Sequence, residues 1–219
     1  MISECCHFKT AMLAPLICVV MFLQFGECKS RIEPAEPAIS EASTSKTTKL
    51  LPDSGKLVGQ QYINYFFRFT YGVPGGLEIV PLQNNPAASR LFDRKNSFAL
   101  LLARSGFSPS DPHIPSQSLR LVATRAEALW GSQWRNKTAA DFLRNLSKTK
   151  HLESQSEPRR VVIRGHVFYA LESKSEHPLA YEMNMCTMAK GFVVSFIFEA
   201  DNQQKLRQLE GSMTKLRFD

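Results

Sequence analysis

The segment that decides the fold is Arg160–Asp219, which reads RVVIRGHVFYALESKSEHPLAYEMNMCTMAKGFVVSFIFEADNQQKLRQLEGSMTKLRFD. Two runs of β-branched and aromatic residues, Val161–Ile163 and Val167–Leu171, are separated by a polar turn, and this pattern is typical of strands. Two longer runs follow, Leu179–Met188 and Phe192–Phe198. Both alternating faces of the last run are apolar, as in a strand that is covered on each side. We therefore expect this strand to be central in its sheet.

The same segment also predicts one strand with unequal faces and a closing helix. Within 179–188 the two faces differ, with Tyr181, Met183 and Met185 alternating against Glu182, Asn184 and Cys186. The period then changes to that of a helix. Capping-box spacing places its start at Asp201 and Gln204, and its apolar face contains Leu206, Leu209 and Met213. We expect three or four strands followed by one amphipathic helix that lies on the sheet.

Upstream of this segment, further apolar runs predict more strands. Tyr62–Val73 is aromatic on both faces and is interpreted as one strand. A Pro-Gly-Gly turn at 74–76 follows it, and Leu77–Leu82 is interpreted as the returning strand of a hairpin. Ser97–Ala103 is predicted to be a buried strand, and Leu119–Ala126 a half-buried one.

Helices and loops complete the prediction. Ala87–Asp93 suggests a short helical turn, and Ser105–Ser118 a long loop. Thr138 and Asp141 have the spacing of a capping box, and the helix that they begin buries Ala139, Phe142, Leu143 and Leu146. Because most connections have hairpin length, the sheet should be mostly antiparallel. The sequence predicts one α+β domain over residues 58–219, an α/β/α-type sandwich with a central, mostly antiparallel sheet.

Residues 1–28 have the pattern of a secretory signal peptide. A short polar lead precedes the apolar run Ala11–Phe25, which is shorter than the ~20 residues of a membrane span. A retained N-terminal anchor helix is the alternative. Cys28 also suggests the lipid acceptor of a bacterial lipoprotein, although Glu27 departs from the small residue expected before it. We expect a secreted or periplasmic protein, attached to a membrane only through a retained signal or a lipid anchor.

Removal of residues 1–28 would leave a basic chain with a single cysteine. The formal charge of +7 would rise to +8, because one lysine and two glutamates are lost. The basic residues are spread thinly, so we expect a solvated surface and no nucleic-acid partner. The one remaining thiol, Cys186, cannot form an internal disulfide. Residues 29–57 are rich in Ser, Thr, Pro and Glu and contain no aromatic residue, which predicts a disordered tether.

The chain resembles the PsbP/Mog1-like superfamily, including its exported bacterial branch. Two parts of the chain carry the resemblance. The first is Tyr62–Phe69, which leads to Val73–Gly76. The second begins at Gly165–Tyr169, continues through a meander to Lys190–Phe192, and ends with an apolar strand, a helix and Leu216–Phe218. It covers roughly residues 60–219 and is a pattern of elements rather than a catalytic signature. It implies an α/β/α-type sandwich used for binding or assembly. Photosynthetic function is not implied, since no matching metal or photosystem contact is present.

No residue cluster in the sequence predicts catalysis. The five histidines, His7, His113, His151, His166 and His177, show no metal-ligand spacing. Phosphate loops and dinucleotide fingerprints are also missing from the sequence. Cys186 is flanked by methionines in a strand pattern, which favours a buried, inert thiol over a nucleophile. We therefore expect a protein that is not an enzyme and that has no cofactor.

The residues most typical of a binding surface are Trp130, Trp134 and Arg135, because tryptophan and arginine are enriched at protein interfaces. The alternative is that both indoles only cover the end of the sheet beside the helix. The leading hypothesis is a monomeric binding or assembly module that uses this surface or the sheet rim to hold another exported or membrane-associated protein. A second hypothesis is a small-ligand carrier with an apolar pocket between sheet and helix, and a third is a hydrolase with an unrecognised site.

Overall fold

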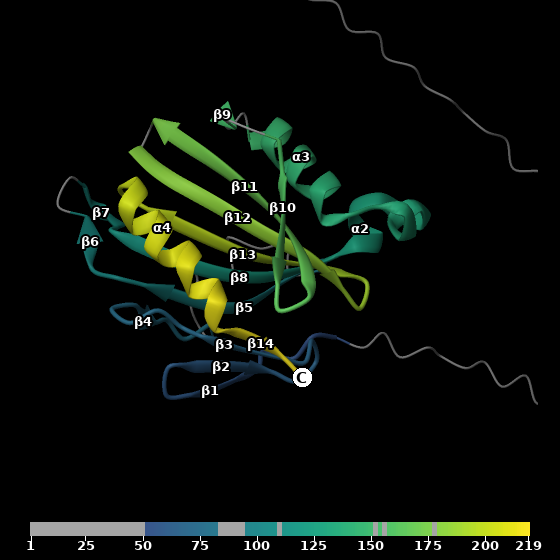
Figure 1. Ribbon diagram of the computed structural model, residues 1–219, viewed down its shortest axis with the longest axis horizontal. Helices are drawn as coiled ribbons and strands as arrows, with labels where there is room; N and C mark the ends of the chain where they lie inside the picture. The colour runs from purple at the N-terminus through teal and green to yellow at the C-terminus, as the bar shows by residue number, and fades with distance from the viewer. Residues whose placement is uncertain (1–50, 83–94, 109–110, 151–152, 155–156, 177–178) are drawn as a thin grey trace, which may run out of the picture. The chain divides into compact units, whose positions relative to one another are not determined.

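The computed structural model describes residues 51–82, 95–108, 111–150, 153–154, 157–176 and 179–219 (Figure 1). Three of the features expected from the sequence lie outside these residues. They are the signal peptide at 1–28, which includes Cys28, the helical turn at 87–93, and all but the end of the tether at 29–57.

The largest element is an eight-stranded sheet in which every pair of neighbouring strands is antiparallel. Its order is β10 (Arg159–Ile163), β11 (His166–Glu176), β12 (Leu179–Ala189), β13 (Phe192–Ala200), β8 (Gln117–Arg125), β5 (Ser97–Arg104) and β4 (Glu78–Ile79). The short β9 (Glu153–Ser154) also pairs with β11. As predicted, the strand built on Phe192–Phe198 is central, between β12 and β8.

A smaller four-stranded sheet corrects the predicted single strand at 62–73. Its order is β1 (Lys56–Val58), β2 (Gln61–Asn64), β3 (Phe69–Gly72) and β14 (Leu216–Phe218). The chain reverses between β2 and β3 because the side chain of Asn64 accepts a hydrogen bond from the backbone N–H of Phe67 at 2.8 Å, and Arg68 adopts a left-handed φ of 56°. The aromatic content of 62–73 correctly indicated burial. The turn formed by the Asn64 side chain, however, divides the segment into the two strands β2 and β3.

The predicted hairpin partner of Leu77–Leu82 is also corrected. Its strand, β4, pairs with β5 of the large sheet, through Glu78↔Arg104 and Ile79↔Ala103. Both edges of β3 are already occupied, one by β2 and the other by the C-terminal β14, so β4 has no free edge of β3 to join. The long loop predicted at 105–118 contains a small hairpin, β6 (Phe107–Ser108) and β7 (Asp111–Pro115).

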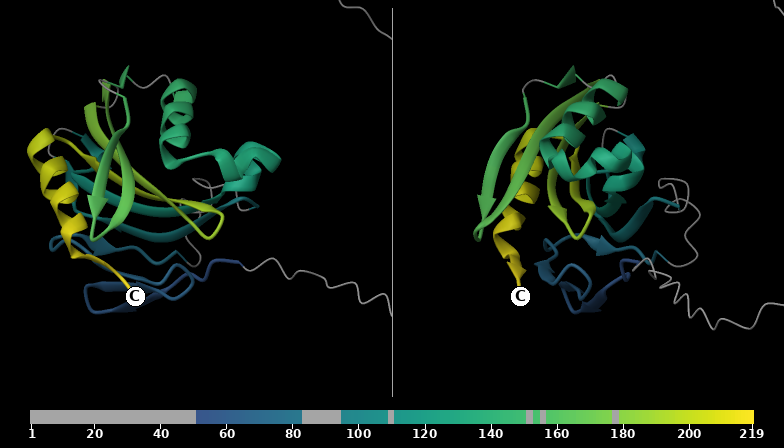
Figure 2. Two further views of the ribbon diagram at one scale, coloured as in Figure 1. Left: turned by 45° about the vertical axis from the view of Figure 1, so that its right-hand side comes forward. Right: turned by 90° about the vertical axis from the view of Figure 1, so that its right-hand side faces the viewer.

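The helices cover both faces of the large sheet and give the predicted α+β layering (Figure 2). On one face, α3 (Ala139–Lys150) buries Ala139 and Leu143 against Leu171, Cys186 and Val193. On the opposite face, α4 (Gln203–Gly211) and the smaller sheet bury the main aromatic core. The shorter helices are α2 (Ala126–Trp130), η1 (Gly131–Asn136) and η2 (Ser212–Lys215).

Two strands predicted to have a more exposed face are buried on both faces. In β12 the more polar face is buried as well, with Asn184 and Cys186 almost inaccessible. In β8, Val122 and Thr124 are buried as well as Leu121 and Ala123. Alternation along one strand does not reveal the second layer, because α3 comes from a separate part of the chain.

The helix starts follow local hydrogen bonding. At α3 the predicted capping box is confirmed: the Thr138 backbone N–H donates to Asp141 at 2.8 Å, and the Asp141 N–H donates to the Thr138 hydroxyl at 3.4 Å. At α4 the cap is Asn202 rather than Asp201, and its side chain accepts from the Lys205 N–H at 2.9 Å. The Asp201 carboxylate instead pairs with the Lys205 ammonium group at 2.8 Å.

Candidate functional site

The structure brings Trp130, Trp134 and Arg135 to one end of the large sheet. Trp130 is half-buried and packs against the small core beneath α3. The Trp134 ring lies beside the β12–β13 turn, with its Cη2 atom 3.8 Å from where a Cβ of Gly191 would lie. The Arg135 guanidinium is 5.4 Å from the centre of the Trp134 ring, within the range of a cation–π contact. The three residues thus form one small surface, whose binding role stays a prediction.

One arginine and two glutamates form a polar network on the α3 face of the sheet. Arg120 forms an ion pair with Glu199 and lies 3.8 Å from Glu182. The Ser118 hydroxyl donates to Glu199 at 2.7 Å, and the Asn184 amide donates to Glu182 at 2.6 Å. Mutual pairing of this kind is typical of structural networks in a sheet.

No group of three or more His, Cys, Asp or Glu side chains in the described part of the chain could hold a metal ion. His166 stacks on Phe218 with ring centres 3.7 Å apart, so it packs the β10–β11 turn against the smaller sheet. His166 is the first residue of β11, directly after the turn at 164–165.

Cys186 is confirmed as a buried thiol. It is fully inaccessible, and its Sγ atom donates a hydrogen bond to the Ser195 hydroxyl at 3.2 Å. Burial raises the pKa of the thiol to about 12, because the thiolate would lose its hydration inside the core. The nucleophilic form is therefore almost absent near neutral pH.

We expect Cys186 to resist alkylation by iodoacetamide in the folded protein at about pH 8, and to react fully in denaturant. Peptide mass spectrometry after labelling measures this residue separately from the four cysteines of the first 28 residues. Rapid labelling under native conditions would contradict the packing described here.

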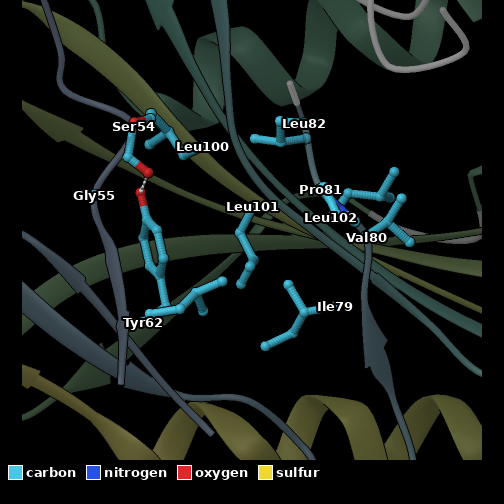
Figure 3. A pocket seen from close by; sticks show the side chains of 11 residues that line it. Ser54, Gly55, Tyr62, Ile79, Val80, Pro81, Leu82, Leu100, Leu101 and Leu102 are labelled. Carbon is cyan, nitrogen blue, oxygen red and sulfur yellow. Dashed lines mark hydrogen bonds between the residues drawn. The ribbon is translucent and has the colours of Figure 1, made fainter. Parts of the chain in front are cut away.

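An apolar cavity lies where the smaller sheet meets the β4–β5 edge of the large sheet, and Figure 3 shows its lining. Its volume is about 330 Å³. The lining residues come from the β1–β2 side and the β4–β5 side, and they are Ser54, Gly55, Leu57, Tyr62, Ile79, Val80, Pro81, Leu82, Leu100, Leu101 and Leu102. None of these side chains is charged.

A β-bulge in β5 shapes the cavity wall. The pairing with β8 shifts between Ala99 and Leu101, which leaves Leu100 as the extra residue. Leu100 and Leu101 are consecutive and yet both buried, and both line the cavity. Bulges redirect side chains in this way and are frequent near functional sites. The sequence shows the run of leucines but not the bulge, so sequence reasoning missed this site.

Tyr62 forms the polar end of the cavity. Its hydroxyl donates to the Ser54 carbonyl at 3.1 Å and accepts from the Asn64 amide at 2.9 Å. In Figure 3 the ring stands beside Leu101 with the hydroxyl directed at Ser54. Burial raises the pKa of this hydroxyl, so it stays protonated and its only donor is already used.

A second depression, of about 470 Å³, lies between β10 and the α4–η2 segment. This is the sheet–helix location that the carrier hypothesis predicted, but its described lining residues include two methionines and no phenylalanine. Its lining consists of Val161, Val162, Ile163, Arg164, Met185, Glu210, Met213 and Thr214. The sequence identified β10 as a strand but not as the edge of the sheet. The position of a strand in a sheet depends on its pairing partners, which its own residues do not specify.

Among the described residues, none of the helices is long and apolar enough to cross a membrane.

No protein-family model matches the chain, and none of the curated proteins matches it. Several solved structures are similar. One is the solution structure of cyanobacterial PsbP (CyanoP) from Synechocystis, with 12% identity, a TM-score of 0.45, and coverage of 75% of this chain and 98% of that one.

Two further structures are similar at lower scores. LpqN, which is involved in cell envelope biogenesis of Mycobacterium tuberculosis, has 14% identity and a TM-score of 0.40, covering 67% of this chain and 78% of its own. A protein from Bacteroides thetaiotaomicron has 12% identity and a TM-score of 0.38, covering 74% of this chain and 49% of its own. At these identities the similarity concerns the arrangement of elements and assigns no activity.

Proposed function

We propose that this protein is an exported, non-catalytic binding module that holds an apolar chain in the cavity between the β1–β2 hairpin and the β4–β5 edge. The observation that carries the proposal is the aliphatic lining of that cavity, built on the bulged pair Leu100 and Leu101. Its volume of about 330 Å³ lies within the range of small-molecule sites, roughly 300–1,000 Å³. The sequence pattern of residues 1–28 supports export.

The lining favours a linear aliphatic ligand over a polar one. No charged side chain is among the described residues that line the cavity, and the donor of the Tyr62 hydroxyl is already engaged with Ser54. A polar ligand would therefore find few hydrogen-bond partners to replace its hydration, and such a loss of hydration is costly. An aliphatic chain gains about 25 cal/mol for each Å² of apolar surface that it buries. A charged headgroup, if present, would lie at the mouth.

This proposal modifies the carrier hypothesis drawn from the sequence. The predicted pocket lay between sheet and helix and was lined by Phe and Met, whereas the cavity lies between a sheet edge and a hairpin and is lined by leucines, isoleucine and valine. It also differs from the leading hypothesis, in which the ligand is another protein. The surface at Trp130, Trp134 and Arg135 is not required for it.

Titration with cis-parinaric acid, a fatty acid that fluoresces in apolar surroundings, tests the proposal. We expect fluorescence enhancement that saturates, and displacement of the probe by both decanoic acid and 1-decanol, since the chain rather than the headgroup is recognised. Val80 lines the cavity and is half-buried, so Val80→Trp should fill part of the space. We expect this variant to bind at least about tenfold more weakly.

The matched control is Leu129→Trp, which adds an indole at an exposed position on α2, outside the cavity lining. This variant should bind the probe like wild type. Equal binding by wild type and Val80→Trp would place the probe elsewhere and contradict the proposal. Absence of any saturable binding by the folded wild-type protein would reject it.

A further inference from the structure

β10 is an edge strand of the large sheet. Among the residues that the structure describes, its one partner is β11, from Arg159↔Ala170 to Ile163↔His166. The right-hand view of Figure 2 places this strand at the outer side of the sheet. An edge strand offers a row of backbone N–H and C=O groups to which another extended segment can pair.

A groove lies beside the β10 edge, between this strand and the α4–η2 segment. On the α4 side, Val161 and Ile163 lie next to Met185 and Met213 in the depression of about 470 Å³. Two arginines connect β10 to the helical segment across it: Arg159 pairs with Glu210, and Arg164 donates to the Thr214 carbonyl at 3.4 Å. Methionines adapt to side chains of different shape. The edge therefore offers the backbone groups of β10 for pairing, and the groove offers a pocket for every second side chain of an added strand.

The opposite side of the edge is exposed and apolar. Val162 is 52% exposed and lies directly across from Val167, which is 37% exposed. Arg160 is exposed on the same side, and its side chain makes no ion pair or hydrogen bond with the described part of the chain. A strand added here would have an aliphatic contact on each face and a cation to pair with.

We propose that β10 and this groove form a docking site for an extended segment of another protein in which acidic and aliphatic residues alternate. Addition of a strand to a sheet edge obtains affinity from backbone hydrogen bonds and specificity from alternate side chains. Charge selects the occupant, because Arg160 is exposed beside Val162 and has no ion pair among the described residues. The β10 strand of a second copy, Arg159–Ile163, contains no acidic residue, so pairing two β10 strands would leave Arg160 without an anionic partner.

Three blocked peptides of about seven residues, enough to span β10, test the proposal with full-length ¹⁵N-labelled protein. The first alternates glutamate and valine, and the second replaces glutamate by lysine. The third is the first with every backbone nitrogen methylated, so that it cannot donate backbone hydrogen bonds in either register. We expect only the first to bind. Its binding should shift the amide resonances of Arg159–Arg164 and slow their hydrogen exchange.

Charge reversal gives a matched pair of variants. Arg160→Glu should weaken binding of the acidic peptide about tenfold. Arg104→Glu reverses an exposed charge on β5, far along the sheet order from β10, and should change the affinity by less than about twofold.

Four results would overturn the proposal: no binding of the acidic peptide, equal binding of the N-methylated peptide, resonance shifts centred on Trp134 instead of β10, or a dimer of this chain that protects the β10 amides. The last would assign the edge to a second copy. Because the cavity is lined by other strands, none of these results bears on the apolar-ligand proposal.

Discussion

Replacement of Phe196 by alanine should lower the free energy of unfolding by about 3–5 kcal/mol, the largest loss that we expect from a single substitution. Phe196 lies in the central strand β13 and is 1% exposed. Its ring contacts come from two other strands, with centroid distances of 5.3 Å to Tyr71 and 6.0 Å to Phe69 of β3, and 6.2 Å to Phe168 of β11. Alanine would leave a cavity at the point where the two sheets meet.

Urea denaturation followed by far-UV circular dichroism measures this loss, provided that the slope of the transition is unchanged. The control is Phe107→Ala, which removes the same side chain from a position that is 60% exposed, and should change the stability by less than about 0.5 kcal/mol. A loss below about 1 kcal/mol for Phe196→Ala would show that the two sheets do not share one core.

The second large effect is expected from Asn64→Ala, at about 2–3 kcal/mol. Asn64 is completely buried and makes three hydrogen bonds: it accepts from the Phe67 N–H at 2.8 Å, and it donates to the Tyr62 hydroxyl at 2.9 Å and to the Asp53 carbonyl at 3.3 Å. Alanine would leave the Phe67 N–H without its partner, and an unsatisfied buried donor costs more than the bond itself contributed.

Thermal and urea denaturation of Asn64→Ala should be compared with those of Asn136→Ala, an exposed asparagine of η1, whose loss should be within about 0.5 kcal/mol. Because Asn64 also holds Tyr62 at the polar end of the cavity, the variant should bind cis-parinaric acid more weakly. Unchanged stability would mean that the β2–β3 turn does not depend on the Asn64 side chain.

These two residues illustrate what could be predicted. Phe196 was expected to be buried in a central strand, because alternation along 192–198 is a local property that any sheet must satisfy. Asn64 was not singled out. The sequence signal that could have divided 62–73 into two strands is the asparagine within the run of aromatic residues, since asparagine favours turns.

The candidate sites were predicted less well than the fold. Trp130, Trp134 and Arg135 were identified by residue type, and the structure places them together without testing their role. The cavity depends on the bulge at Leu100, and the docking edge depends on β10 having one partner strand among the described residues. Neither property is visible in the residues themselves.

The sequence by itself determined the strands β10–β13, the helices α3 and α4, and the burial of Cys186. In each case the pattern repeats over neighbouring residues, so alternation, helical period and capping suffice. Only the tertiary structure decided that β14 pairs with β3, that β4 therefore joins β5, and that β12 is covered on both faces. The physical reason is that backbone hydrogen bonds are the same for every residue, so the choice among distant partners depends on how all the layers pack together.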